Sequence, residues 1–209
     1  MIKPIGKFIV VEGLEGAGKS SAINAITHVL QTNDIDHITT REPGGTPMAE
    51  RIRECVKHDW EERVDEKTEL LLMYAARVQL VENTIKPALE RGVWVIGDRH
   101  DLSSQAYQGG GRGLDKTVLG QLKSLTLGDF EPDLTLYLDI DPEVGLRRAK
   151  GRGALDRIEK ASLDFFIRTR ERYLELVNHN EKAEVIDAMQ DMPLVHQRLK
   201  DIMRSYVSS

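Results

Sequence analysis

The sequence predicts an α/β fold in which helices cover both faces of a parallel sheet of five strands. Residues 93–97 and 134–138 form continuous apolar runs, which are typical of strands buried on both faces. Segments with helical patterns separate the predicted strands, and parallel strands need a crossover of this kind between them. The 209 residues contain no linker, repeat or low-complexity tract, so we expect one domain over residues 1–209.

The elements are expected to alternate along the chain. The predicted strands span residues 8–12, 36–40, 93–97, 134–138 and 184–187. The predicted helices span residues 21–30, 47–58, 65–90, 143–150 and 193–205, and another begins at Ser103. The helix at 65–90 has apolar residues near a 3.6-residue period, and Asp141 followed by Pro142 is typical of a helix start. Residues 108–113 and 147–157 have no expected place in the core.

A glycine-rich motif, G-x-x-x-x-G-K-S, follows the first predicted strand and precedes the first predicted helix. This is the context of a phosphate-binding P-loop. Glycines let successive backbone N–H groups point at one anion, and the N-terminus of the following helix adds partial positive charge. Lys19 would reach the β- and γ-phosphates, and the Ser20 hydroxyl would sit on Mg²⁺. The expected ATP-binding residues are Gly13, Leu14, Glu15, Gly16, Ala17, Gly18, Lys19 and Ser20.

An acid and an arginine follow the third predicted strand directly, as Asp98 and Arg99. Ligands of open α/β sheets bind beyond the carboxyl ends of the strands, so we expect both side chains at the site. Asp98 is placed to organise Mg²⁺, and Arg99 can hold a phosphate group through two parallel hydrogen bonds. The alternative is a capping aspartate beside a solvated arginine. We interpret His100 as a structural residue.

The polar segment after this acid has two interpretations. Hydroxyls and amides such as those of Ser103, Ser104 and Gln108 could read the edge of a base, and Tyr107 could wall off a sugar. The alternative is a surface helix that a serine caps.

Basic residues also gather around two glycines, at Arg147, Arg148, Lys150, Arg152 and Arg157. Arginines on such a segment suit a mobile lid, at about residues 147–158, that closes on a triphosphate and excludes water. An arginine there would offset the negative charge that spreads over a transferring phosphoryl group. The alternative is a charged helix end, because basic residues favour helix C-termini.

The composition is that of an ordinary globular protein, with 40% hydrophobic and 30% charged residues. The net charge of −5 argues against a nucleic-acid-binding protein, which normally carries a basic excess. No apolar run approaches the ~18 residues of a membrane span. The first strand begins too early for a signal peptide, so we expect a cytoplasmic protein without a membrane partner. We interpret the only cysteine, Cys55, as a small buried apolar residue.

Among P-loop proteins, the sequence favours a nucleotide kinase. It has neither the N-K-x-D motif nor the D-x-x-G motif of a GTPase switch, and a motor ATPase is usually larger. The chain resembles thymidylate kinases (dTMP kinases) of the bacterial kind over nearly its whole length. The segments that carry this resemblance are residues 12–20, 40–46, 74–77, 97–100, 106–113, 132–134 and 153–157.

The resemblance implies transfer of the γ-phosphoryl group of ATP to dTMP, giving dTDP and ADP in dTTP synthesis, with Mg²⁺ as the cofactor. It also implies a homodimer, whose seam would use apolar positions at 47–58 or 65–90. Two alternatives remain: a kinase of another nucleotide or deoxynucleoside on the same scaffold, and a nucleotide-binding regulatory protein without transfer activity. The tolerance for dUMP is also open.

The family's site roles fall on matching positions of this chain. Arg99 should hold the dTMP phosphate, Arg77 should bind the thymine ring, and Tyr107 should exclude a ribonucleotide by crowding the 2′ position. Glu15 should face the 3′-hydroxyl group. The implied dTMP-binding residues are Glu15, Arg41, Pro43, Arg53, Met73, Arg77, Arg99, Ser103, Ser104, Tyr107 and Gln108.

The family carries its catalytic arginine either in the P-loop or in the lid. Gly16 follows Glu15 here, so the resemblance assigns that role to Arg152 first and Arg148 second. The implied catalytic residues are Lys19, Arg152, Arg148, Glu15 and Asp98, and Ser20 and Asp98 would hold the metal directly or through water. Met73 departs from the family, which often has a phenylalanine stacked on thymine there; losing this stacking costs about 0.5–1.5 kcal/mol.

Overall fold

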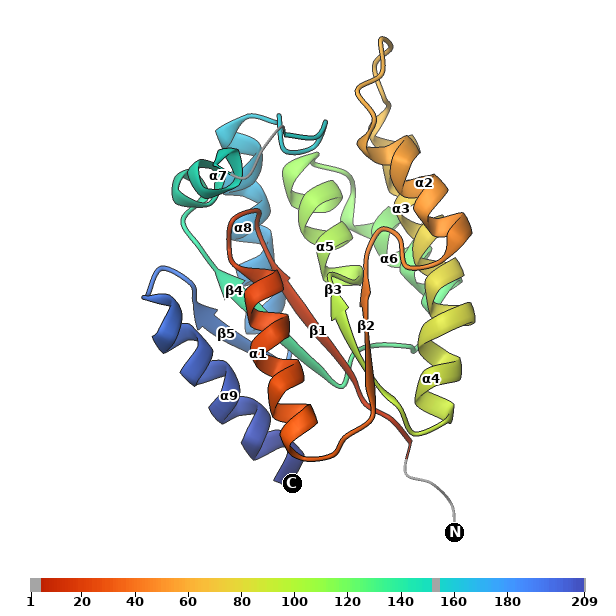
Figure 1. Ribbon diagram of the computed structural model, residues 1–209. Helices are drawn as coiled ribbons and strands as arrows, with labels where there is room; N and C mark the ends of the chain where they lie inside the picture. The colour runs from red at the N-terminus through yellow and green to blue at the C-terminus, as the bar shows by residue number, and fades with distance from the viewer. Residues whose placement is uncertain (1–4, 152–154, 209) are drawn as a thin grey trace.

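The structure is a computed structural model, and it describes residues 5–151 and 155–208. Its sheet has five parallel strands in the order β2-β3-β1-β4-β5, which confirms the predicted fold class (Figure 1). The strands are β1 (Phe8–Gly13), β2 (His37–Arg41), β3 (Trp94–Asp98), β4 (Leu134–Asp139) and β5 (Ala183–Asp187). All six residues of β1 are buried, because this strand lies at the centre of the sheet with helices on both faces.

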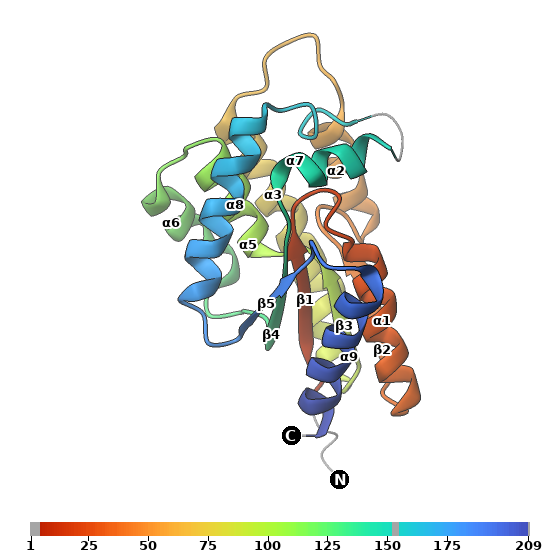
Figure 2. The ribbon, with the colours of Figure 1, turned by 90° about the vertical axis from the view of Figure 1, so that its left-hand side faces the viewer.

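Helices cover the sheet on both faces. Figure 2 shows α1 (Lys19–Thr32) and α9 (Met192–Ser208) on one side of the strands, and α5 (Asp101–Ser104) and α8 (Leu163–Asn178) on the other. The remaining helical segments are α2 (Pro47–Lys57), α3 (Glu66–Leu80), η1 (Val81–Ile85), α4 (Lys86–Glu90), η2 (Gln105–Gly111), α6 (Lys116–Leu127) and α7 (Pro142–Lys150). No helix in residues 5–151 and 155–208 is both long and apolar enough to cross a membrane.

Most predicted helices are present with small shifts at their ends. The Asp141 carboxylate accepts hydrogen bonds from the backbone N–H groups of Glu143 and Val144, which confirms it as the cap of α7. The predicted helix at 65–90 is continuous but contains the π-helical turn η1. Cys55 is exposed, so its interpretation as a buried residue was wrong.

Two helices, α6 and α8, had no counterpart in the prediction. The sequence does carry a signal for α8, since its buried residues Phe165, Thr169, Tyr173 and Val177 recur every four positions. The Ser162 hydroxyl caps its first turn.

The topology brings three loops together at one edge of the sheet. Val11 of β1 and Arg41 of β2 both pair with Asp98 at the end of β3. The P-loop after β1, the loop after β2 and the turn after β3 therefore leave the sheet side by side. This is the edge at which open α/β sheets bind their ligands.

Candidate active site

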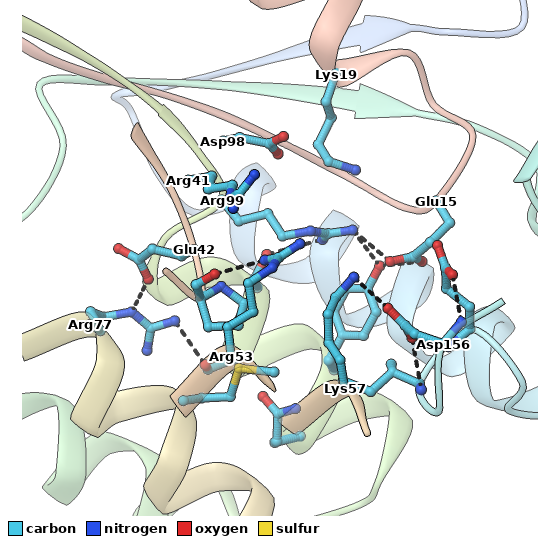
Figure 3. A pocket seen from close by; sticks show the side chains of 18 of the residues that line it. Glu15, Lys19, Arg41, Glu42, Arg53, Lys57, Arg77, Asp98, Arg99 and Asp156 are labelled. Atoms are coloured by element: carbon cyan, nitrogen blue, oxygen red, sulfur yellow. Dashed lines mark hydrogen bonds and ion pairs between the residues drawn. The ribbon is translucent and has the colours of Figure 1, made fainter. Parts of the chain in front are cut away.

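A cavity of about 250 Å³ opens at this edge of the sheet (Figure 3). Sixteen predicted site residues line it: Glu15, Gly16, Gly18, Lys19, Ser20, Arg41, Pro43, Arg53, Met73, Arg77, Asp98, Arg99, Ser103, Ser104, Tyr107 and Gln108. The lining also includes Glu42, Lys57 and Glu159, which had no predicted role, and Asp156 and Ile158 of the predicted lid segment. The predicted residues Gly13, Leu14, Ala17 and Arg148 do not line it.

The P-loop wraps closely around its own lysine. The Nζ atom of Lys19 donates hydrogen bonds to the carbonyl oxygens of Gly13 and Leu14, at 3.0 and 3.1 Å. Burial, together with the positive charge of Arg99, lowers the pKa of Lys19 to about 8. The glycines take the left-handed conformation, with φ of 76° at Gly16 and 92° at Gly18. These features fit a loop whose N–H groups and lysine face a phosphate chain.

We expect kcat/KM for ATP to fall as the pH rises through about 8 in the free enzyme. Lys19 attracts the triphosphate only while it is protonated, and kcat/KM reports the pKa values of the free enzyme. The measurement is steady-state kinetics from about pH 6.5 to about 9.5 with dTMP well below its KM, where the free enzyme is the species that binds ATP. In Lys19→Arg the guanidinium stays charged over this range, so its profile should lack the fall. A flat wild-type profile would contradict the assignment.

Arg99 lies at the centre of the cavity in a strained backbone conformation. Its φ is 72°, which is uncommon for a residue with a side chain and clusters at functional sites. Its Nη2 atom donates to Glu15 Oε1 at 2.7 Å and to the Tyr107 hydroxyl at 3.1 Å, as Figure 3 shows for the acid. Its Nη1 atom donates to Ser103 Oγ at 3.2 Å. The fork of donors thus faces the P-loop acid and can hold an anion bidentately.

A buried carboxylate that was not predicted as a site residue supports the turn after β3, which carries Arg99. Glu12 of β1 is fully buried and accepts hydrogen bonds from the backbone N–H of His100, the hydroxyl of Ser103 and the hydroxyl of Tyr173. Burial raises the pKa of Glu12, against the opposing charge of Arg99. The sequence does carry a signal for this role, which is a glutamate within an apolar predicted strand. Burying a carboxylate costs free energy unless it is hydrogen-bonded.

Arg77 forms the opposite wall of the cavity. Its Nε atom donates to Glu42 Oε2 at 2.6 Å, and its Nη2 atom donates to the carbonyl of His100 and to Ser104 Oγ. The buried Nη1 atom has no hydrogen-bond partner among the described residues, but it forms an ion pair of 3.7 Å with Asp101 Oδ1. Although burial opposes the charge, Glu42 and Asp101 raise the pKa of Arg77, so it stays a pure donor.

His100 supports Arg77 without lining the cavity. Its Nδ1 atom lies 2.7 Å from Glu42 Oε1, and its ring packs edge-on against Phe8. These contacts agree with the structural interpretation of His100.

The outer rim of the cavity is basic. Arg41 donates to Glu50 at 2.9 Å, and Arg53 donates to the carbonyl of Pro43 at 2.7 Å. Lys57 forms an ion pair of 2.7 Å with Asp156, visible in Figure 3. This pair joins α2 to the predicted lid segment, and its members are 99 residues apart in the sequence, too far for a pattern to pair them.

In the described part of the lid segment, two arginine side chains bond to residues that do not line the cavity. Arg148 donates to the carbonyl of Ala188 at 3.3 Å, and Arg157 donates to Glu69 at 2.7 Å. Arg152 lies outside the described residues, as do residues 153–154. In residues 147–151 and 155–158, no arginine or lysine lines the cavity.

The fold and the cavity define a class of protein. The P-loop faces the guanidinium of Arg99, and Arg77 on the opposite wall can donate hydrogen bonds to a further polar group. The site therefore suits a kinase that holds a nucleoside triphosphate beside a phosphorylated acceptor. The family model described as thymidylate kinase matches residues 11–199. A thymidylate kinase of Alteromonas mediterranea is 63% identical over 203 residues, which cover 97% of this chain and 91% of the relative. The chain belongs to the thymidylate kinase family.

Proposed function

We propose that the protein transfers the γ-phosphoryl group of ATP to dTMP, giving dTDP and ADP. One observation carries this proposal: the P-loop and the arginines that can bind a second anion and a base line the same cavity. Membership of the thymidylate kinase family supports the choice of dTMP as the acceptor.

Catalysis rests on positioning and charge, because phosphoryl transfer needs little covalent chemistry from the protein. The P-loop and Lys19 bind the triphosphate, Arg99 binds the dTMP phosphate, and Arg77 donates to the thymine ring. The Tyr107 hydroxyl donates to Glu15 Oε2 at 2.6 Å. This pair would hold the deoxyribose, with Glu15 toward the 3′-hydroxyl group and the ring against the 2′ carbon. The aromatic ring would then exclude a 2′-hydroxyl group by contact.

Asp98 and Ser20 fit a magnesium ion carried with ATP. Both residues line the cavity, and the buried Asp98 Oδ1 has no hydrogen-bond partner among the described residues. Mg²⁺ is usually held by one or two protein ligands together with water and phosphate oxygens, and Asp98 and Ser20 could supply them. When bound, the ion would neutralise charge on the phosphate oxygens.

A substrate panel tests the proposed reaction. ADP release is measured with dTMP, dUMP, dCMP, dGMP, AMP and thymidine as acceptors. The proposal expects the highest kcat/KM with dTMP. A higher value with another acceptor would make the protein a different nucleotide or nucleoside kinase, and ATP binding without acceptor-dependent turnover would indicate a regulatory protein.

We expect Met73→Phe to lower KM for dTMP about two- to tenfold, with kcat unchanged. Met73 is half-buried and lines the cavity beside Arg77, where a ring would stack on thymine. Initial rates at saturating ATP measure the change. Met73→Leu is the control, because it offers no aromatic face. If KM for dTMP stayed the same or rose in Met73→Phe, the stacking argument would fail.

We also propose a homodimer, with its seam on α3 and α6. Leu71 of α3 and Val118 and Leu125 of α6 are exposed, Leu125 with 83% of its surface in solvent. The two helices pack on each other, so their exposed apolar residues can form one surface that buries its area against a second copy. Light scattering should give a mass twice the 23.6 kDa of the chain, and a mass of one chain would refute the dimer.

A further inference from the structure

A buried glutamate of α3 that no step above uses lies behind the base side of the cavity. Glu69 is 1% exposed and does not line the cavity. Its Oε1 atom accepts from Gln108 Nε2 at 2.8 Å and from Arg112 Nε at 3.2 Å. Its Oε2 atom accepts from Arg112 Nη2 at 3.0 Å and from Arg157 Nη2 at 2.7 Å.

The charge of Glu69 decides which way the Gln108 amide faces. An ionised carboxylate only accepts hydrogen bonds, so the NH₂ group of Gln108 must turn toward it. Burial alone would raise the pKa of Glu69, but Arg112, Gln108 and Arg157 hold it below the usual value. The carboxylate is therefore ionised at neutral pH, and its preference for a donor is permanent.

The opposite end of the amide is then left for the ligand. Gln108 lines the cavity, and its Oε1 atom accepts no hydrogen bond from any described residue. The cavity thus offers an acceptor from Gln108 beside the guanidinium of Arg77, which also lines the cavity and can only donate. Thymine presents an N3–H donor and an O4 acceptor, which match this pair. Cytosine presents the reverse, an N3 acceptor and an amino donor.

We propose that Glu69 is a positioning residue that sets base selectivity by holding Gln108 with its carbonyl oxygen toward the base. This inference rests on the proposed function and extends it to a residue that does not touch the substrate. A flipped Gln108 would point its carbonyl at the Glu69 carboxylate and lose a charge-assisted hydrogen bond, worth about 1.5–3 kcal/mol. When dCMP binds to the wild-type protein, either the Gln108 amide flips at this cost or N3 of cytosine is left without a hydrogen bond.

Glu69→Gln tests this step because it keeps the shape and removes the charge. A glutamine at position 69 can pair with the Gln108 amide in either orientation, so flipping becomes nearly free. Ki for dCMP as an inhibitor competing with dTMP is expected to fall about tenfold or more. KM for dTMP should rise only about twofold, since half of the molecules must reorient Gln108. General damage to the fold would weaken the binding of both nucleotides, whereas the proposal predicts tighter dCMP binding.

Two further variants isolate the path through Gln108. In a Gln108→Met background there is no amide to reorient, so adding Glu69→Gln should leave Ki for dCMP unchanged. Arg112→Lys is the matched control, since it alters another partner of Glu69 but keeps a positive charge beside the carboxylate and leaves Gln108 in place; Ki for dCMP should again stay at the wild-type value. Ki and KM are concentrations, so a partly unfolded preparation does not change them.

The outcomes separate this inference from the proposed function. An unchanged or higher Ki for dCMP in Glu69→Gln overturns the positioning role, as does an equal fall in the Gln108→Met background. Failure of the wild-type protein to phosphorylate dTMP would instead overturn the proposed function itself.

Discussion

Replacing Arg99 with methionine is expected to lower kcat/KM for dTMP by about 10³ while KM for ATP changes little. Each charge-assisted hydrogen bond contributes about 1.5–3 kcal/mol, so loss of a two-pronged grip removes about 3–6 kcal/mol. That range corresponds to about 10² to 10⁴ in kcat/KM. Both kcat and KM should change, because the acceptor phosphate loses its position as well as its affinity.

The structure explains why no neighbour can replace Arg99. Arg41 and Arg53 line the rim and bond to Glu50 and to the carbonyl of Pro43, whereas Arg99 bonds to Glu15 and so lies beside the P-loop. Arg99 instead projects from a turn that the Glu12 carboxylate fixes through the backbone N–H of His100. The positive φ of Arg99 aims the guanidinium at Glu15, across the cavity from β3.

Two variants complete the Arg99 experiment. Arg99→Lys keeps the charge without the planar fork, so we expect a loss between wild type and Arg99→Met. Arg198→Met removes an arginine from an exposed ion pair with Glu184, and its kcat/KM should equal that of wild type. If Arg99→Met kept kcat/KM for dTMP within about tenfold, the phosphate grip would belong to another residue.

Local sequence patterns predicted the sheet and the edge of it at which the cavity opens. Apolar runs mark strands buried on both faces, and parallel strands bring their carboxyl ends to one edge. Gly13–Ser20 and Asp98–Arg99 could therefore be expected to meet, although they are about 80 residues apart. In the structure Glu15 and Arg99 are hydrogen-bonded at 2.7 Å.

The carboxylates that hold those residues could not be paired from the sequence. Glu12 lies on β1, Glu42 on the loop after β2 and Glu69 on α3, and each bonds partners 35 or more residues away. Such partnerships depend on tertiary distances, which hydrophobic periodicity does not encode. The family resemblance predicts that Arg77 binds the thymine ring, but it does not predict the hydrogen bonds of Arg77 to Glu42, His100 and Ser104.

The structure gives a physical reason why the P-loop has a glycine, and not an arginine, at position 16. A Cβ atom at this position would lie 2.2 Å from the carbonyl oxygen of Gly145, well inside contact distance. Gly145 in turn approaches the carbonyl of Glu15, so α7 packs on the P-loop through two glycines. The P-loop cannot carry an arginine at position 16 without moving α7, and this supports an origin of the catalytic charge in the lid.

Arg152→Ala is expected to lower kcat by at least about 10³, the range seen when an arginine finger is lost. KM for dTMP should change little, because the arginine acts on charge that develops in the transition state. Single-turnover phosphoryl transfer at saturating ATP and dTMP measures the effect directly. Arg147→Ala is the matched control, since Arg147 is exposed and does not line the cavity.

The result for Arg152→Ala also shows whether Arg152 or another group stabilises the negative charge of the transition state. Adding Gly16→Arg to Arg152→Ala should not restore turnover, because the new side chain would collide with the backbone of Gly145. Near-normal turnover in Arg152→Ala alone would shift the role to Arg148 or to backbone donors of the P-loop. Arg148 would then have to leave the carbonyl of Ala188, so Arg148→Ala would show the loss of about 10³ in kcat instead.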